Sequence, residues 1–210
     1  MLGDLAARAS LWNRRRKLAL FLEAMQPGPE TRLVDVGVGD TPFGTEPGVA
    51  ATHNFFEAHY PWPQRITAVS DVPLPSFSQA FPSIRTVVAN GLELPFADDE
   101  FDVAFSNAVV EHVGGREEQR RFVAELCRVA PRVFLSTPNK WFPVETHTLV
   151  PLAHWLPRRA ADRTMHALGR ENWDRVELLG KRELLALFPP TVDARAVEAR
   201  VTISVAADRG

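Results

Sequence analysis

The sequence has almost no cysteine. Cys127 is the single cysteine among 210 residues, so the chain can form neither an internal disulfide framework nor a cysteine-based metal cluster. We therefore expect no metal ion in its functional site. A lone cysteine is also typical of proteins in a reducing compartment, which favours a cytoplasmic location.

Long apolar runs and a surplus of one charge sign are missing as well. No stretch approaches the roughly 20 apolar residues of a membrane span, and the N-terminus lacks the apolar core of a signal peptide. The 24 lysines and arginines nearly balance the 26 acidic residues, which gives a net charge of −2 and a pI near 6.3. We therefore expect a soluble protein with no membrane span and no nucleic-acid partner.

What the sequence does contain is a short apolar run that ends in glycines. Apolar side chains occupy both odd and even positions of residues 33–38, which predicts a strand buried on both faces of a parallel sheet. Gly37 and Gly39 allow a sharp turn and a close approach of a ligand to the backbone. Such a turn, at the carboxyl end of a central strand, is where open α/β sheets bind nucleotide-like ligands.

The residues around this turn narrow the choice of ligand. A phosphate-binding loop would need a lysine, which is missing, and the dinucleotide fingerprint would need a third glycine where the chain has Pro42. The carboxylate of Asp35 instead favours a cationic or hydroxyl-rich ligand. S-adenosylmethionine (SAM) carries an ammonium, a sulfonium and a ribose diol, so it fits that chemistry.

The rest of the chain alternates predicted helices and strands. Leucine spacing predicts an amphipathic helix over residues 2–25, and we expect the basic run at residues 14–17 on its solvated face. Further strands are predicted at residues 65–71, 85–89, 103–106 and 133–136, with an antiparallel pair at 192–199 and 201–206. Other helices are predicted at residues 50–60, 119–130, 149–155, 158–168 and 183–188.

Five short motifs follow one another in a specific order. They are the glycine turn at 35–39, an acid after the next strand, Asn-Gly-x-x-Leu-Pro-Phe at 90–96, Phe-Asp-Val at 101–103 and Ser-Asn-x-x-x-Glu-His at 106–112. This succession resembles the class I SAM-dependent methyltransferases of the ubiquinone/menaquinone-biosynthesis type, also called methyltransferase type 11. The resemblance implies an α/β fold, a Rossmann-like three-layer α/β/α sandwich whose mostly parallel seven-stranded sheet has an antiparallel C-terminal strand. It also implies one domain over residues 1–210, with the N-terminal helix at about 2–25 and a small helical lid at about 139–180.

The resemblance assigns nine residues to SAM, the implied cofactor. Those at the methionine end are Asp35, Gly37 and Gly39, with Ser106 and Asn107 beneath them. The nucleoside end would use Asp71 for the ribose hydroxyls, Asn90 for the adenine amino group, and Gly91 or Leu92 for a backbone amide to the ring.

Three positions depart from the family pattern. Thr41 stands where a third glycine is usual, and Asn90 replaces an aspartate. Ser70 occupies the usual place of the ribose acid, so Asp71 comes one residue late. Because an amide still offers an acceptor, the change at Asn90 preserves a partner for the adenine amine.

Methyl transfer is an in-line displacement that requires alignment of nucleophile, methyl carbon and sulfur, and a hydroxyl acceptor also benefits from a base. Candidates for that base are His147 and His112, with Glu145 as an orienting group or alternative base. Substrate contacts are expected from the loop after the fifth predicted strand, at Asn139, Trp141 and Phe142. We expect a small-molecule acceptor with a lipid-like or aromatic scaffold, and oxygen in preference to nitrogen or carbon as the acceptor atom.

Two other functions remain open at this point. The departures from the family pattern also suit a catalytically inactive homologue that serves as a binding or scaffold subunit. An NAD-dependent oxidoreductase would share the sheet and the ribose acid. However, its complete glycine fingerprint and a matching set of catalytic residues are missing from the sequence.

Overall fold

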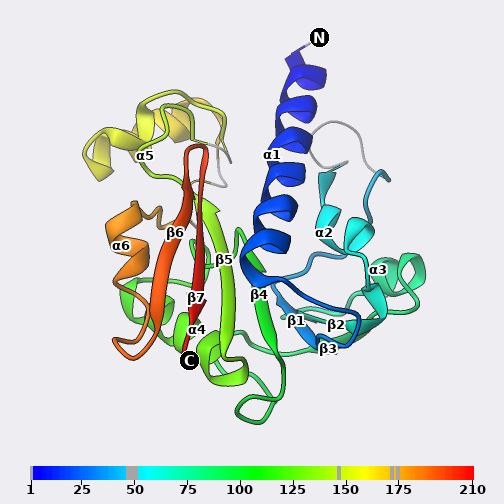
Figure 1. The fold of residues 1–210 in the computed structure, drawn as a ribbon. Coiled ribbons are helices and arrows are strands. Elements are labelled where there is room, and N and C mark those ends of the chain that lie inside the picture. Colours follow the sequence, from blue (N-terminus) through cyan, green and yellow to red (C-terminus); the bar gives the residue numbers. More distant parts are fainter. Residues whose placement is uncertain (1, 46–51, 146–147, 171–172, 174–175) are drawn as a thin grey trace.

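Seven strands form one sheet at the centre of the computed structural model, which describes residues 2–45, 52–145, 148–170, 173 and 176–210. In spatial order they are β3 (Arg85–Val88), β2 (Ile66–Ser70), β1 (Leu33–Val36), β4 (Val103–Asn107), β5 (Arg132–Pro138), β7 (Thr202–Asp208) and β6 (Asp193–Ala199). Neighbours from β3 to β5 are parallel, whereas β7 runs antiparallel to both β5 and β6 (Figure 1). The predicted mostly parallel seven-stranded sheet with an antiparallel C-terminal strand is confirmed.

The burial of the strands follows their place in the sheet. Every residue of β1 and β2 is buried, as the apolar run after residue 32 predicts for a strand covered on both faces. The edge strand β3 is mostly open to solvent, and so is the other edge strand, β6. The strand β7 is buried along nearly its whole length because it lies inside the sheet, between β5 and β6.

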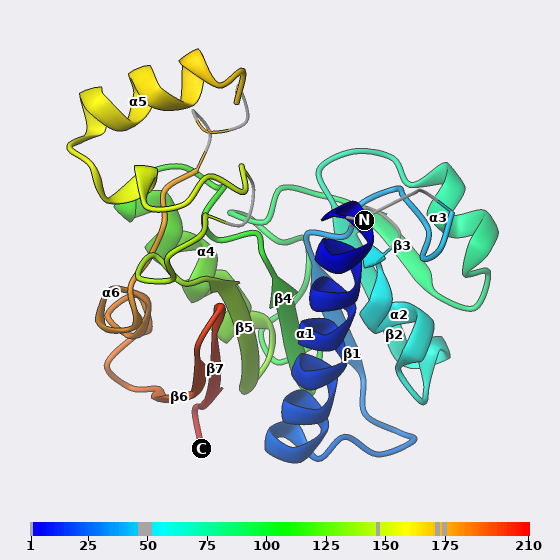
Figure 2. The same cartoon turned by 90° about the horizontal axis from the view of Figure 1, so that it is seen from above.

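One face of the sheet is covered by the helices α1 (Leu2–Met25), α2 (Phe55–His59) and α3 (Pro75–Ala80). Phe21 of α1 is fully buried, and its ring meets that of Phe56 edge-on at a centroid distance of 5.0 Å. Figure 2 shows α1 lying along this face beside β4 and β1. The first helix of the chain is therefore part of the core layer next to the central strands.

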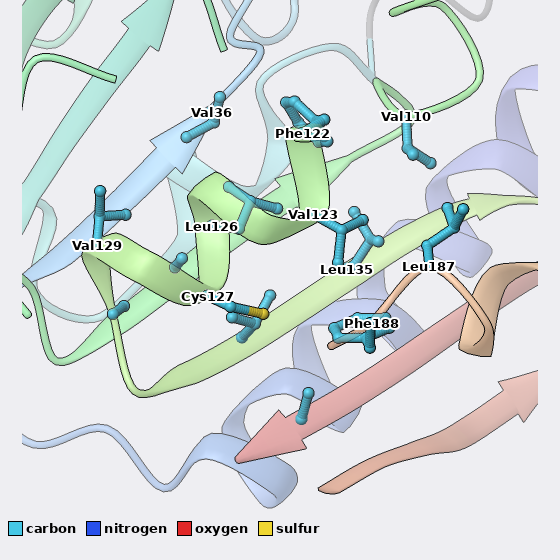
Figure 3. Packing of buried hydrophobic residues seen from close by; sticks show 14 of the residues in the cluster. Val36, Val110, Phe122, Val123, Leu126, Cys127, Val129, Leu135, Leu187 and Phe188 are labelled. Atoms are coloured by element: carbon cyan, nitrogen blue, oxygen red, sulfur yellow. The ribbon is translucent and has the colours of Figure 1, made fainter. Parts of the chain in front are cut away.

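The opposite face is covered by α4 (Arg116–Val129) and α6 (Lys181–Leu185), which completes the three predicted layers. Phe122, Leu126 and Cys127 of α4 point into this second core (Figure 3). Burial raises the pKa of Cys127 to about 12, so its thiol packs as a small apolar group. Within the described ranges, no helix is long and apolar enough to cross a membrane.

The segment between β5 and α6 has a small core of its own. Its helical parts are the short turn η3 (Ala153–Trp155) and α5 (Arg158–Ala167), and the two views place α5 on the side of α6, away from α1 (Figures 1 and 2). The predicted helix at residues 149–155 is wrong for most of its length. Leu149 and Leu152 adopt φ values of 58° and 61°, which an α-helix cannot contain.

Candidate functional site

The chain turns sharply where β1 ends. Gly37 has a φ of 100°, and a Cβ there would lie 2.1 Å from Cγ2 of Val109. The amides of Gly37 and Val38 both donate to the carbonyl oxygen of Val69, at 2.9 and 3.1 Å, which ties the turn to β2. Apart from its chain neighbours, no residue that the structure describes would lie within 4 Å of a Cβ on Gly39. The protein itself therefore requires glycine at position 37, whereas the space beside Gly39 is open to a ligand.

A cavity of about 440 Å³ opens on one side of this turn, at the carboxyl ends of β1, β2 and β3. It brings together six residues that the sequence placed in the functional site: Gly37, Asp71, Asn90, Gly91, Leu92 and His112. The cavity is concave and lined by both apolar and polar groups, so it suits a ligand of nucleoside size. We call it the first cavity.

The loop after β3 is held by one of its own side chains. Oδ1 of Asn90 accepts a hydrogen bond from the amide of Leu92 at 2.9 Å. A Cβ on Gly91 would lie 2.8 Å from the ring of Phe122, so the loop packs closely on α4. Because the internal bond occupies the Leu92 amide, Gly91 is the residue of the two that can offer its amide to a ligand.

The acid that follows β2 lies at the rim of the first cavity. Asp71 and Ser70 both line it, but Ser70 is buried and its Oγ accepts a hydrogen bond from the amide of Val72 at 3.4 Å. Asp71 is exposed, so its carboxylate can accept two hydrogen bonds from neighbouring hydroxyls. The shift of one residue relative to the family pattern still leaves an acid at the cavity.

A second cavity, of about 270 Å³, lies on the other side of the turn. The two cavities adjoin, because Gly37 and Ala108 line both of them. In addition to Gly37, the second cavity contains three residues predicted from the sequence: Asp35, Gly39 and Asn107. It also contains three charged or titratable residues that sequence reasoning did not assign: Arg14, His53 and Glu57.

Two buried acids lie together in the second cavity, and we call Asp35 and Glu57 the acid pair. Asp35 is 4% exposed and Glu57 is 5% exposed. Burial and the neighbouring Glu57 raise the pKa of Asp35 well above its ordinary value, and burial also raises the pKa of Glu57. Both acids are therefore harder to ionise than isolated carboxyl groups, so the pair binds a proton at a higher pH than the same acids in the unfolded chain.

The basic residues of α1 do not all face solvent, so the prediction of a solvated basic face is wrong. Lys17 is only 8% exposed, and its Nζ donates to Oδ1 of Asn107. Burial, together with the charge of Arg14, lowers the pKa of Lys17 to about 7. Nε of Arg14 donates to Oγ1 of Thr52 at 2.8 Å, and the Arg14 side chain lines the second cavity.

The helical spacing of α1 already indicates that Arg14 does not lie on the solvated face. Residues 11, 14, 18, 21 and 25 follow one another at steps of three or four, so Arg14 lies within the stripe that buries Phe21 and Met25. A charged residue inside an otherwise apolar stripe signals a polar partner in the fold. Reading residues 14–17 as one charged block missed that signal, and no comparable pattern marks Glu57.

Two predicted site residues, Ser106 and Glu145, form hydrogen bonds within the fold. Ser106 is fully buried, and its Oγ donates to the carbonyl oxygen of Val36 at 2.8 Å. Glu145 is 2% exposed, and its Oε2 accepts a hydrogen bond from the amide of Thr148 at 2.6 Å. Neither is among the described residues that line the two cavities. The other candidate from this loop, His147, lies outside the described residues.

The three predicted substrate residues follow β5 and are not among the described residues that line the cavities. Asn139 uses both ends of its amide within the fold: Nδ2 donates to the carbonyl oxygen of Arg200 at 2.8 Å, and Oδ1 accepts from the amide of Trp141 at 3.0 Å. Trp141 is 64% exposed, and Phe142 is half-buried. The geometry thus gives Asn139 a structural role and leaves the Trp141 ring on the surface.

His112 is the predicted base that the structure places at a cavity. Its side chain is 39% exposed, lines the first cavity and has Nε2 4.0 Å from Oε1 of Glu111. Glu111 is fully buried and accepts a hydrogen bond from Oγ1 of Thr137 at 2.8 Å. A buried carboxylate held in this way can fix the orientation of the imidazole ring.

A family model described as a methyltransferase domain matches residues 58–132. The matched part runs from α2 to β5 and includes the first-cavity residues Asp71, Asn90, Gly91, Leu92 and His112. A comparison with curated proteins found no match. The family match and the strand order confirm the resemblance to the class I SAM-dependent methyltransferases of type 11.

Solved methyltransferase structures share this fold. The N-methyltransferase NodS from Bradyrhizobium japonicum WM9, solved with S-adenosyl-l-homocysteine, is 13% identical at a TM-score of 0.57, and the match covers 94% of this chain and 86% of that one. The geranyl diphosphate C-methyltransferase from Streptomyces coelicolor A3(2) is 14% identical at a TM-score of 0.55, and the match covers 94% of this chain and 79% of that one. The 1,6-didemethyltoxoflavin-N1-methyltransferase from Burkholderia thailandensis is 17% identical at a TM-score of 0.55, and the match covers 92% of this chain and 76% of that one. At these identities the likeness shows the fold, which is that of the class I methyltransferases.

Proposed function

We propose that the protein is a SAM-dependent methyltransferase that moves a methyl group from SAM to a small-molecule acceptor. The observation that carries this proposal is the pair of adjoining cavities at the glycine turn. One cavity has the size of a nucleoside, and the other is lined by charges of both signs. Two neighbours with the same fold were solved with S-adenosylhomocysteine, and the matched family is one of methyltransferases.

The residues around the two cavities fit SAM. Asp71, Asn90 and Gly91 all line the first cavity. We propose that Asp71 holds the ribose hydroxyls and that Asn90 and the amide of Gly91 meet the adenine ring. In the second cavity, Asp35 supplies negative charge for an ammonium, and the open space beside Gly39 leaves room near the backbone. SAM, when bound there, supplies an electrophilic methyl group on its sulfonium.

The chain must then align the acceptor with the methyl group and keep water away. We propose that residues 139–180 form a lid for this purpose, within one domain over residues 1–210. Three observations support it: the segment starts at the carboxyl end of β5, has its own small core, and exposes the apolar side chains of Trp141, Leu152 and Trp155. Such a surface suits a lipid-like or aromatic acceptor.

We favour oxygen as the acceptor atom. A hydroxyl must lose a proton on methylation, and His112, in contact with the buried Glu111, is a group that can take it. His147 is the second candidate for this role. The names of the neighbours give no preference, since NodS is an N-methyltransferase and the Streptomyces enzyme is a C-methyltransferase.

The first test is calorimetric titration of the purified protein with SAM, S-adenosylhomocysteine and NAD. We expect micromolar binding of the two sulfur compounds and none of NAD; selective binding of NAD would overturn the proposal. Transfer of a labelled methyl group from SAM to a panel of hydroxylated and amine acceptors then tests the activity. Binding of SAM without transfer to any acceptor would favour an inactive homologue.

A further inference from the structure

We propose that the segment between β5 and α6 docks on an anionic lipid surface through exposed apolar side chains flanked by two arginines. The apolar side chains follow β5 and precede α5; they are Trp141, Leu152, Trp155 and Leu156, which we call the apolar patch. The two arginines are Arg159 and Arg163 of α5. Docking goes beyond the proposed function, because it requires neither SAM nor an acceptor and can be measured without them.

The apolar patch keeps four large apolar side chains in contact with solvent. Its members are between 44% and 64% exposed, and the ring centroids of Trp141 and Trp155 lie 6.5 Å apart. Leu152 and Leu156 flank the short turn η3, which ends at Trp155. None of the four lines the first or the second cavity. A cluster of exposed apolar side chains outside the cavities indicates a surface that meets another apolar medium.

Both indole rings of the apolar patch turn their polar atom towards the protein. Nε1 of Trp155 donates to the carbonyl oxygen of Lys140 at 2.8 Å. A Cβ on Gly180 would lie 2.7 Å from Nε1 of Trp141, so the N–H end of this ring also lies against the chain. The exposed parts of the two rings are therefore hydrocarbon, which suits the boundary between head groups and acyl chains.

The segment is basic within an acidic chain. Residues 139–170 contain five lysines and arginines but two acids, whereas the whole chain has a net charge of −2. Glu145 is buried, and Asp162 forms an ion pair with the first arginine of α5. Among the residues that the structure describes, no acid forms an ion pair with Arg159 or Arg163. Their two positive charges are therefore available to an anionic surface.

The arginines lie close to the apolar patch. Arg159 follows Leu156 by three residues, so their Cα atoms are at most about 11 Å apart. Arg159 and Arg163 are one helical turn apart, and both are exposed on the side of α5 that faces away from the buried Ala161 and Met165. The two views place α5 at the outside of the molecule, away from α1 (Figures 1 and 2).

A lipid surface accounts for both features of the segment. Anionic head groups attract the arginines, and the indole rings and leucines enter the acyl boundary. A protein partner would instead be expected to fill a pocket, and the apolar patch lines neither cavity. A second copy in a two-fold interface would bring the same arginines towards each other, so like charges would oppose it.

Docking through this segment also suits the position of the cavities. The apolar patch begins three residues after β5, and β5 runs parallel to β4. The carboxyl ends of these strands share one edge of the sheet, which is the edge that holds both cavities. A protein docked in this way holds its site beside the lipid.

The decisive experiment is flotation of the purified full chain, without SAM, on vesicles of phosphatidylcholine alone or mixed with phosphatidylglycerol. We expect at least about tenfold tighter binding to the mixed vesicles, and a loss of this preference as salt is raised. The double variant Arg159→Gln/Arg163→Gln should bind the mixed vesicles about 10–30-fold more weakly. The matched control is Arg85→Gln/Arg195→Gln, which removes two exposed arginines from the edge strands β3 and β6 and should stay within about twofold of wild type.

A second measurement tests the apolar half of the surface. Brominated phosphatidylcholine in the mixed vesicles should quench tryptophan fluorescence of the wild type. The quenched fraction should fall in Trp141→Ala, because that ring enters the acyl boundary. Trp12→Ala is the matched control: Trp12 is an exposed tryptophan of α1, and its removal should not reduce the quenching.

The outcomes separate docking from the proposed function. Equal binding of the wild type to both kinds of vesicle, or binding to neither, overturns docking on an anionic surface and needs no variant. An equal loss in the two double variants also overturns it, because general charge attraction then explains the binding. A dimer in analytical ultracentrifugation that Trp141→Ala disrupts would assign the apolar patch to a second copy instead. Calorimetry with SAM on the same preparation tests the proposed function independently of these results.

Discussion

The two cavities share Gly37 but are built in different ways. The first is lined by residues that directly follow strands, such as Asp71 after β2 and Asn90 after β3. The second depends on Arg14 from α1 and Glu57 from α2, which reach the same place from distant parts of the chain. A site made of strand ends can be read from the order of the strands, whereas a site closed by helices depends on how those helices pack.

The largest effect is expected from a change in the turn that both cavities share. Gly37→Ala places a Cβ 2.1 Å from Cγ2 of Val109 at a φ of 100°. We expect the free energy of unfolding to fall by about 2–4 kcal/mol and the affinities for S-adenosylhomocysteine and 5′-methylthioadenosine both to drop. Denaturant unfolding and calorimetry measure the two effects.

Gly39→Ala is the matched control for that variant, because a Cβ there lies beyond 4 Å from every described residue other than its chain neighbours. It should leave stability within about 1 kcal/mol of wild type. Of the two cavities, Gly39 lines only the second. The Gly39→Ala variant should therefore lower the affinity for S-adenosylhomocysteine more than the affinity for 5′-methylthioadenosine. Equal weakening of both ligands by Gly39→Ala would contradict the division of the site into two cavities.

A change confined to the first cavity should not distinguish these two ligands. Asp71→Ala removes an acceptor for the ribose hydroxyls that both ligands carry, so we expect each affinity to fall by about 10–100-fold. Ser70→Ala should change them by less than about threefold, because that buried hydroxyl already accepts from the Val72 amide. Calorimetry that shows the larger loss for Ser70→Ala would assign the ribose to the position that the family pattern expects.

The acid pair predicts a pH dependence that belongs to the second cavity. The pKa of Asp35 and that of Glu57 are raised in the native state, so native protein holds a proton that the unfolded chain has lost. Stability of the ligand-free protein should therefore fall as pH rises from about 4.5 towards the raised pKa, by up to about 1.4 kcal/mol per pH unit. Glu57→Gln should reduce that slope in urea unfolding measured from pH 4.5 to 7.5.

Glu117→Gln serves as the control for this slope, since Glu117 is an acid of α4 whose side chain is 86% exposed. It should reproduce the wild-type dependence of unfolding free energy on pH. A difference between wild type and Glu57→Gln that stays constant over the whole pH range would show that the fold does not raise the pKa values of the acid pair.

The smallest effect is expected outside both cavities. Trp141 is 64% exposed, so Trp141→Ala should change stability by less than about 1 kcal/mol and S-adenosylhomocysteine affinity by less than about twofold. If residues 139–180 act as a lid, Trp141→Ala should raise the KM for the acceptor, which can be measured once an acceptor is found. A tenfold loss of S-adenosylhomocysteine affinity would instead place Trp141 at the cofactor.

Local patterns predicted the elements well where burial is periodic. The helix over residues 2–25 was predicted with the bounds it has, and the strands differ by a few residues at their ends. The prediction failed at residues 149–155 because the left-handed backbone of Leu149 and Leu152 has no signature in residue type. Leucine is a good helix former, and only tertiary packing makes such a conformation acceptable.

Residue type and spacing could not tell a ligand-binding polar group from one that serves the fold. Ser106 and Asn107 are adjacent at the end of β4, yet Ser106 bonds to the backbone of β1 and Asn107 lines the second cavity. Successive side chains of a strand point to opposite faces, but the partner that each one finds depends on the neighbouring strand and helix. Glu145 shows the same ambiguity, because its carboxylate accepts a hydrogen bond from the amide of Thr148.

The α/β class and the glycine turn follow from the sequence alone, and its resemblance to the type 11 methyltransferases adds the expected strand-end residues of the first cavity. Hydrophobic periodicity, the special backbone of glycine and the order of strands are local properties, and they bring the carboxyl ends of parallel strands to one edge. The tertiary structure was needed to show that Arg14 and Glu57 line the same cavity as Asp35 and that Lys17 is buried. The spacing of α1 signals that Arg14 needs a polar partner, but that partner comes from a distant part of the chain and no local pattern identifies it. Burial then shifts the pKa values of these groups.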